Sequence, residues 1–291
     1  MSFTDKRVYR AGTRESALAL AQTDLLIRRI QESSNVELLA RPMKTSGDLL
    51  TDRSLASIGG KGLFTRELDR ALLEGSIDLA VHSLKDMPCH LPDGLAIAAF
   101  SKREDPRDVL VLPITGPSPE KPIGCSSKRR ALQLARLFPG WKTAPVRGNV
   151  LSRLEKLDRG EYGALVLAAA GLKRLGLARR ISRFFEADEM LPAPGQGILC
   201  VVIRAEDDFP FLRAAADPDS ACCALAERAL VEALGGGCAS AIGAYAEVDG
   251  RRLTLRGLSF ETPGVTPLQG SVRGEKTEAE ALGRHLARQL R

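Results

Sequence analysis

Basic and hydroxyl side chains follow four short apolar segments of this 291-residue chain. The four runs are Gly12-Thr13-Arg14-Glu15-Ser16, His82-Ser83-Leu84-Lys85-Asp86, Ser126-Ser127-Lys128-Arg129-Arg130 and Arg147-Gly148-Asn149. Three of them lead directly into expected helices, whose first N–H groups carry a partial positive charge and attract anions. Arginine binds a carboxylate through two parallel hydrogen bonds. Together the runs indicate a cleft for a small molecule that carries several carboxylates.

Each run also has a purely structural explanation. Ser16, Ser126 and Ser127 could simply cap helices, and Arg129 and Arg130 could lie in a solvent-exposed first turn. For any one run this explanation is the better one. Because arginine in the first turn of a helix opposes the helix dipole, four such runs together favour a shared anionic ligand.

Asp86 follows Lys85 in a loop that ends at Pro88, on the expected ligand side of a sheet. Its carboxylate could act as a general acid or base, or stabilise a developing cation. It could equally cap a turn or pair with Lys85. The glycine-rich run around Lys61 lacks the GxxxxGK(S/T) spacing of a phosphate-binding loop, so we interpret it as a flexible flap.

Cys238 ends the run Gly235-Gly236-Gly237, where little side-chain bulk would hinder a large group from approaching the sulfur. A thiolate is a strong nucleophile, and a basic cleft would lower its pKa. A small buried hydrophobe is an equally good interpretation. The six cysteines and three histidines show no CxxC pair and no zinc-site spacing, so we predict neither a disulfide scaffold nor a metal site.

Alternating strand and helix patterns are expected to position these side chains. In the first part they predict strands at 8–11 and 77–81 and helices from about 16 and over 64–73, which is typical of a largely parallel sheet. Residues 101–121 contain four prolines and are expected to be a linker. The pattern then restarts with strands at 123–125, 144–146 and 164–169 and helices over 129–138 and 150–157. Residues 191–197 are expected to cross between domains before a strand at 198–203.

The last part of the chain has a different pattern. A helix is expected over 222–234, followed by strands 243–248 and 251–258 that Asp249-Gly250 joins in a hairpin. A strand at 269–273 and a helix carrying Leu282, Leu286 and Leu290 complete it. The predicted fold class is α/β, with two α/β domains, 1–101 (with return segment 198–217) and 102–197, and a small α+β domain, 218–291, built on an antiparallel sheet.

Composition narrows the class of protein. Hydrophobic residues are 44% and charged residues 27%, which is typical of a folded domain, and there is neither a run of ~20 apolar residues nor a secretory signal. We therefore expect a cytoplasmic location and no membrane partner. The net charge of +6 would permit nucleic-acid binding, but aromatics are only 4%, which favours small anions. A non-catalytic carboxylate sensor and a basic nucleic-acid-binding module are the alternatives.

Eight motifs in order resemble those of the porphobilinogen deaminase (hydroxymethylbilane synthase) family. They are GTRESALALAQ (12–22), GGKGLFTREL (59–68), VHSLKDMP (81–88), CSSKRR (125–130), VRGNVLSRLEKLD (146–158), LAAAGLKRLGL (167–177), PAPGQG (192–197) and GGGCASAIGAYAEV (235–248). The resemblance implies two periplasmic-binding-protein-like domains and a third, smaller one. It also implies a transferase of haem and porphyrin biosynthesis that condenses four porphobilinogens head to tail, with loss of ammonia, and releases hydroxymethylbilane by hydrolysis.

The resemblance also implies roles for single residues. Asp86 would be the catalytic carboxylate, and Cys238 would anchor a dipyrromethane cofactor through a thioether. The residues that would hold the cofactor are Ser83, Lys85, Ser127, Arg129, Arg130 and Gly197. Those that would bind substrate are Arg14, Ser16, Arg147, Arg153 and Arg174. Lys61 would lie in a mobile loop, and we expect a monomer. Cys125, Lys128 and Ala241 depart from the family pattern without removing a catalytic group.

Overall fold

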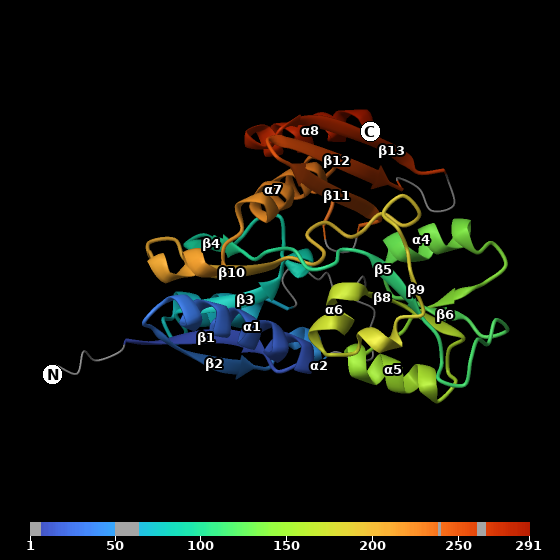
Figure 1. Ribbon diagram of the computed structural model, residues 1–291, viewed down its shortest axis with the longest axis horizontal. Helices are drawn as coiled ribbons and strands as arrows, with labels where there is room; N and C mark the ends of the chain where they lie inside the picture. Colours follow the sequence, from blue (N-terminus) through green and yellow to red (C-terminus); the bar gives the residue numbers. More distant parts are fainter. Residues whose placement is uncertain (1–6, 50–63, 238–239, 261–265) are drawn as a thin grey trace.

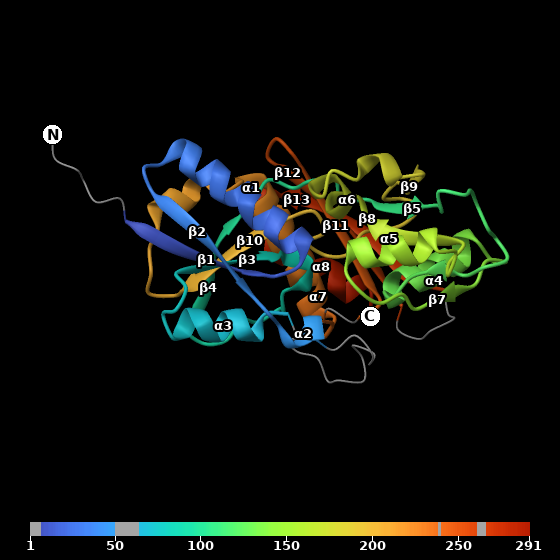
Figure 2. The same cartoon turned by 90° about the horizontal axis from the view of Figure 1, so that it is seen from below.

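The computed structural model describes residues 7–49, 64–237, 240–260 and 266–291, and Lys61 and Cys238 lie outside these ranges. The described chain forms two five-stranded sheets and one three-stranded sheet. The two larger sheets lie side by side, and the C-terminal part with the smaller sheet lies across them (Figures 1 and 2).

The first sheet has the strand order β2-β1-β3-β10-β4. The bounds are β1 Val8–Arg14, β2 Glu37–Met43, β3 Leu79–Ser83, β4 Leu95–Phe100 and β10 Leu199–Arg204. β1 pairs in parallel with β2 and β3, whereas β10 runs antiparallel to both β3 and β4. Four strands of this sheet therefore run in one direction and β10 alone is reversed, so the expectation of a largely parallel sheet is confirmed except for β10. β10 returns from the far part of the chain and enters between two strands that are close in sequence.

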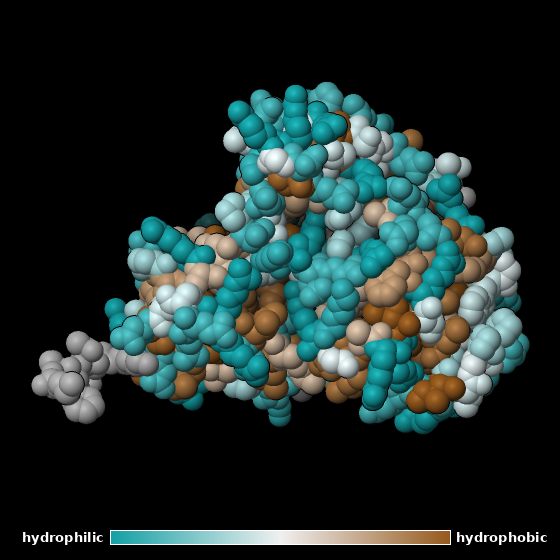
Figure 3. All heavy atoms as spheres, in the orientation of Figure 1, coloured by the Kyte–Doolittle hydropathy of each residue, from teal (hydrophilic) through white to brown (hydrophobic). Residues whose placement is uncertain are grey.

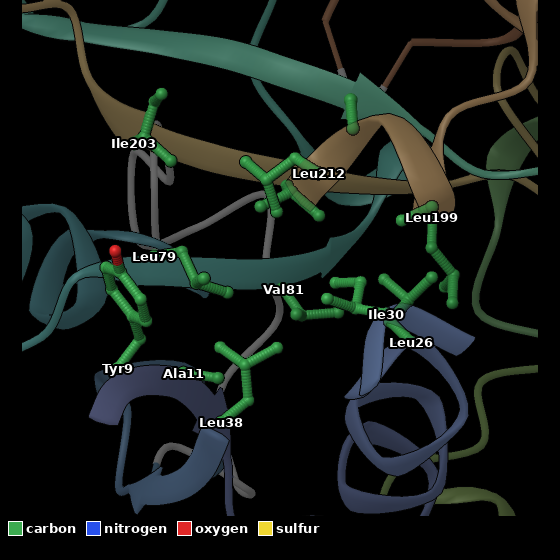
Figure 4. Close-up of a cluster of buried hydrophobic side chains, with 13 residues drawn as sticks. Tyr9, Ala11, Leu26, Ile30, Leu38, Leu79, Val81, Leu199, Ile203 and Leu212 are labelled. Atoms are coloured by element: carbon green, nitrogen blue, oxygen red, sulfur yellow. The ribbon is translucent and has the colours of Figure 1, made fainter. Parts of the chain in front are cut away.

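Helices cover both faces of this sheet because its strands alternate their side chains. Leu199 and Val201 of β10 pack with Leu26 and Ile30 of α1 (Ala17–Ser33), and Figure 4 shows this cluster. Cys200 and Val202 point to the opposite face, where α3 (Arg66–Leu73) packs. This period of two is the geometry of a strand that is buried on both sides. The short α2 (Ser46–Leu49) and the 3-10 segment η4 (Pro210–Ala215) complete this part.

The second sheet has the order β7-β6-β8-β5-β9, and again a parallel half adjoins an antiparallel one. Its strands are β5 Asp108–Val111, β6 Ile123–Gly124, β7 Thr143–Ala144, β8 Ala164–Ala168 and β9 Arg183–Phe184. Its helical segments are α4 Lys128–Leu137, α5 Val150–Asp158, α6 Ala169–Arg174 and η3 Ala178–Arg180.

Strand β5 corrects the expectation that residues 101–121 are a linker. All four of its residues are buried, and it pairs with β8 and β9. Pro106 and Pro113 lie outside the strand, so they end it without removing any of its N–H donors.

The third sheet is an antiparallel meander of β11 (Ile242–Asp249), β12 (Arg252–Ser259) and β13 (Leu268–Glu275). The predicted hairpin at Asp249-Gly250 is confirmed, with Gly250 at φ +58°. Helices α7 (Pro218–Ala233) and α8 (Ala279–Gln289), the latter preceded by η5 (Lys276–Glu278), bury a common core against the sheet. The predicted class, two α/β units with a small antiparallel C-terminal unit, is confirmed, while the domain boundaries themselves stay predictions.

The chain passes between the two larger sheets along two segments that touch. The N–H of Glu104 donates to the carbonyl of Gly197 at 3.1 Å. Gly197 has φ +91°, and a Cβ there would lie 2.2 Å from the carbonyl oxygen of Glu104. Glycine is therefore required at this position by conformation and by space, independently of any ligand.

The surface view agrees with a chain of mixed composition. On the face shown in Figure 3, hydrophilic side chains dominate the C-terminal part and the middle of the molecule, and hydrophobic atoms occur in scattered patches. Within the part of the chain that the structure describes, no helix combines the length and apolarity needed to cross a membrane.

Candidate active site

Asp86 lies just beyond the end of β3, in the 3-10 turn η2 (Leu84–Asp86). The Leu84 side chain is 2% exposed, and its N–H donates to the carbonyl of Ile198 at 3.0 Å. The N–H of Met87 closes the turn on the carbonyl of Leu84, also at 3.0 Å. A buried leucine thus anchors the turn, and the carboxylate of Asp86 stays partly exposed on the side of the sheet where ligands bind in open α/β folds.

One pocket lies where the three sheets meet. Its lining includes three of the predicted cofactor residues, Lys85, Ser127 and Arg129. Gly237 and Ser240 also line it, and these are the described residues on either side of the gap that contains Cys238. We call this the anchor pocket.

A second pocket lies between the two larger sheets, and we call it the inter-sheet pocket. Predicted residues of both kinds line it: Ser83, Lys85, Arg130, Gly197, Arg153 and Arg174. Lys85 lines both pockets. The two groups of predicted carboxylate-binding residues are therefore brought together around one lysine.

Four of the predicted residues that the structure describes line neither pocket. Arg14 lies over the ring of Phe64 at 4.2 Å, and Ser16 caps α1 by accepting the N–H of Ala19 at 3.3 Å. The other two are Arg147 and Asp86. Asp86 is nevertheless close enough to Lys85 for its negative charge to act on the pKa of that lysine, which it raises.

The capping explanation of the serines is correct in part. Ser127 accepts the N–H of Arg130 at 3.4 Å as the cap of α4, in addition to lining the anchor pocket. Ser126 has another role, because its hydroxyl donates to the carbonyl of Val146 at 2.6 Å.

A buried carboxylate, Asp108, holds the two arginines in the first turn of α4. Arg129 Nη1 lies 2.8 Å from Asp108 Oδ2, and Arg130 Nη2 lies 2.7 Å from Asp108 Oδ1. The side chain of Asp108 is fully buried, and those of Arg129 and Arg130 are 3% and 10% exposed. Burial alone would raise the pKa of Asp108, but the two guanidinium groups outweigh it and hold that pKa well below its usual range.

Asp108 changes the explanation of the arginine placement. The idea of a solvent-exposed first turn was wrong, and a shared external anion is not needed to account for the position of these arginines. Sequence reasoning missed Asp108 because it assigned residues 101–121 to a linker. An acidic residue directly before the apolar run Val109-Leu110-Val111 was the available signal.

Positive charge nevertheless remains uncompensated, because one carboxylate faces two guanidinium groups. Burial, together with the nearby arginines, lowers the pKa of Lys85 to about 8, although Asp86 and Asp108 act against it. Burial likewise lowers the pKa of Arg174 to about 10. A cation whose pKa is lowered would be stabilised by an added anion, so both pockets are electrostatically suited to carboxylates.

Arg174 and Arg153 are held by backbone carbonyls. Arg174 Nη2 donates to the carbonyl of Gly197 at 2.6 Å, and Arg153 Nε donates to that of Gly148 at 2.8 Å. The Nε of Arg174 is buried without a hydrogen-bond partner in the described structure. Within the same described part, no group of three His, Cys, Asp or Glu side chains is arranged to hold a metal ion.

Comparison with known proteins identifies the family. Residues 9–210 match the model described as "Porphobilinogen deaminase, dipyromethane cofactor binding domain", and residues 221–291 match "Porphobilinogen deaminase, C-terminal domain". Similar proteins named porphobilinogen deaminase include one from Alkaliphilus oremlandii, 48% identical with 97% of this chain and 96% of that protein covered. Another, from Chromobacterium violaceum, is 47% identical with 96% of this chain and 93% of that protein covered.

Among solved structures, the periplasmic VFT2 domain of Bordetella pertussis BvgS aligns with 72% of this chain and 84% of that domain, at a TM-score of 0.40 and 13% identity. The family models together span both larger sheets and the C-terminal sheet, and the full-length relatives agree with them. The chain belongs to the porphobilinogen deaminase family.

Proposed function

We propose that this chain condenses four porphobilinogen molecules head to tail, with loss of ammonia, on a covalent dipyrromethane primer, and releases hydroxymethylbilane by hydrolysis. Family membership supports the reaction. The observation that carries the proposal is that Lys85 lines both the anchor pocket and the inter-sheet pocket. A growing chain of pyrroles, each with two carboxylates, needs adjoining sites of this kind.

The residues present fit the cofactor that the family uses. Lys85, Ser127 and Arg129 in the anchor pocket would bind its carboxylates, and Arg130 with Ser83 would bind those that extend into the inter-sheet pocket. The lowered pKa of Lys85 and the unpartnered Nε of Arg174 support the assignment of these two residues to carboxylate binding. When bound, the dipyrromethane supplies the terminal pyrrole carbon to which the first substrate is joined.

We assign the covalent anchor to Cys238 and the proton and charge chemistry to Asp86. Gly237, which precedes Cys238 in the sequence, lines the anchor pocket, and this supports the assignment. Asp86 would stabilise the positive charge that develops as ammonia leaves porphobilinogen. Arg153 and Arg174 would orient the carboxylates of the incoming substrate, and Arg14, Ser16 and Arg147 stay predictions from the family motifs.

We also propose that three domains carry this site: 1–101 with 198–217, 102–197, and 218–291. The membership of β10 in the first sheet supports the return segment. A cytoplasmic monomer stays a prediction from the sequence.

The covalent anchor predicts a mass excess. Intact mass spectrometry of active protein is expected to show the polypeptide plus two pyrrole units, and Cys238→Ser is expected to lack that excess. Cys89→Ser is the matched control, because the Cys89 thiol lines the anchor pocket and its loss is expected to leave the excess in place. Fully active protein with the bare polypeptide mass would refute the cofactor assignment and favour a reversible carboxylate sensor.

If Asp86 acts in catalysis, its substitution should lower turnover without removing the cofactor. Asp86→Asn keeps the size of the side chain and removes its negative charge, so we expect it to retain the two-pyrrole excess and to lower turnover of porphobilinogen by about 10²–10³-fold. Steady-state rates and intact mass, measured on the same preparation, would test this. Unchanged turnover would rule out the proposed role.

If Lys85 binds cofactor carboxylates, the pKa of its amine should differ between protein with and without the cofactor. Without the cofactor, in Cys238→Ser, its amine is expected to titrate at about pH 8. Because carboxylates favour the charged ammonium, the cofactor is expected to raise that pKa towards 10.4, so binding above pH 8 takes up a proton. Competitive acetylation across pH, read by peptide mass spectrometry, measures both forms.

Lys276 provides a control for this titration. It pairs with Asp219 at 2.7 Å near the protein surface, away from both pockets, and that carboxylate raises its pKa. Its acetylation midpoint is expected to be the same in Cys238→Ser and in the wild type. Equal midpoints for Lys85 in the two proteins would contradict carboxylate binding at this lysine.

A further inference from the structure

Arg228 of α7 binds the backbone just after Asp86. Its Nη2 donates to the carbonyl oxygens of Pro88 at 2.9 Å and Cys89 at 2.8 Å. The side chain also lines the anchor pocket. None of the roles assigned above uses it.

Other residues of the same helix face contact the same segment. Ala224, one turn before Arg228, is fully buried in a cluster with Leu84 and Met87, which flank the turn of Asp86. One turn after Arg228, Glu232 Oε1 lies 3.5 Å from the Nε2 of His90. Residues four apart share a helix face, so the contacts to Pro88, Cys89 and His90 come from the same face of α7 as the buried Ala224.

The same helix also leads to the glycine run that precedes Cys238, the proposed cofactor anchor. α7 ends at Ala233, and Gly236 and Gly237 follow within four residues. The Sγ of Cys89 donates to the carbonyl of Gly236 at 3.8 Å, which joins the two loops directly. The turn that carries Asp86 and the glycine run that enters the anchor pocket are therefore attached to one helix.

We propose that Arg228 is a positioning residue, whose guanidinium fixes the turn of Asp86 against α7 and so sets the place of that carboxylate relative to the anchor pocket. The proposal rests on the proposed function, because it gives Asp86 its catalytic role. Leu84 fixes the N-terminal side of the turn through the carbonyl of Ile198, and Arg228 fixes the C-terminal side.

The hydrogen bonds of Arg228 affect the position of the Asp86 turn more than the stability of the fold. Water can satisfy the two carbonyls if the partly exposed guanidinium is removed, so the fold loses little. Water cannot hold the loop at a fixed distance from the helix, and a shift of about 1 Å at a reacting group can cost ~10²-fold in rate.

The test uses Arg228→Met, which keeps the length of the side chain and removes its donors, and Arg228→Lys, which keeps a cationic donor. We expect Arg228→Met to retain the two-pyrrole mass excess and to lower kcat by about 10- to 100-fold with KM within about twofold. Arg228→Lys should recover part of the loss. Arg284→Met is the control, because Arg284 on α8 makes only an exposed pair with Glu280 and should leave kcat unchanged.

A double-mutant cycle separates positioning from a general structural effect. If Arg228 acts through Asp86, adding Arg228→Met to Asp86→Asn should lower kcat by less than about twofold further. The same loss in both backgrounds, an unchanged kcat in the single variant, or a raised KM with unchanged kcat would each overturn the proposal. If Arg228→Met does not fold, Arg228→Gln, which also removes the charge, replaces it and is judged by the same criteria. Full turnover in Asp86→Asn alone would instead refute the proposed role of Asp86, and this proposal with it.

Discussion

The buried pairing of Asp108 with Arg129 and Arg130 is the interaction on which the site depends. Two guanidinium groups could not stay inside the protein without a neutralising partner, because the cost of burying an unpaired charge is several kcal/mol. Asp108 comes from β5, both arginines come from α4, and the Nε2 of Gln196 donates to Asp108 Oδ1 at 2.8 Å from the segment that returns to the first sheet. One carboxylate thus joins a strand, a helix and an inter-sheet segment before any ligand binds.

This arrangement fixes the arginine side chains in advance of ligand binding but does not fully neutralise their charge. The arginines are fixed in place, yet the positive charge of the cluster exceeds the negative charge. Burial, to which the two arginines add, lowers the pKa of Lys85 to about 8. A site that holds its cations rigidly and leaves them under-neutralised favours ligands with several carboxylates over neutral ones. The chemistry of a pyrrole carrying an acetate and a propionate matches this requirement.

A second buried ion pair attaches the C-terminal sheet to the same region. The carboxylate of Glu227 on α7 is fully buried and forms an ion pair with Arg103, whose Nη2 lies 2.7 Å from Glu227 Oε1. It also accepts a hydrogen bond from the N–H of Gly195 at 2.6 Å. The N–H of Ala246 in β11 donates to it as well, at 2.7 Å. Arg103 and Gly195 belong to the two segments that pass between the larger sheets. The third sheet is therefore joined to the molecule at the crossing point, next to the anchor pocket.

Much of the fold could be predicted from the sequence where local pattern decides the structure. The helices at 129–138 and 150–157 and the hairpin at Asp249-Gly250 have strong periodic or turn signals, and they lie within one or two residues of the expected places. The strand at 198–203 and its return to the first domain were expected, but its antiparallel direction and its place between β3 and β4 were not, because pairing across more than one hundred residues is decided by tertiary packing. The short β5 was hidden by its flanking prolines.

The sequence predicted many of the residues that line the site, but not the buried partner that holds two of them in place. Lys85, Arg129 and Arg153 do line pockets. Asp108, the partner of Arg129 and Arg130, was missed because its one signal, a place directly before an apolar run, lay in a proline-rich segment that was expected to be a linker. Arg147 was expected from family motifs and lines neither pocket. Cys238 follows the described glycine run but itself lies outside the described ranges, so its assignment depends on its neighbours and on the family.

The free energy of unfolding of Asp108→Asn, measured by chemical denaturation at pH 7, tests the central claim most directly. Asp158→Asn is the comparison, because Asp158 pairs with Arg180 at 2.7 Å with side chains 27% and 19% exposed. We predict a loss of about 3–5 kcal/mol for Asp108→Asn, which leaves two buried arginines unpaired, and about 0–1 kcal/mol for Asp158→Asn. Equal, small losses in both variants would show that the buried carboxylate does not hold the site together.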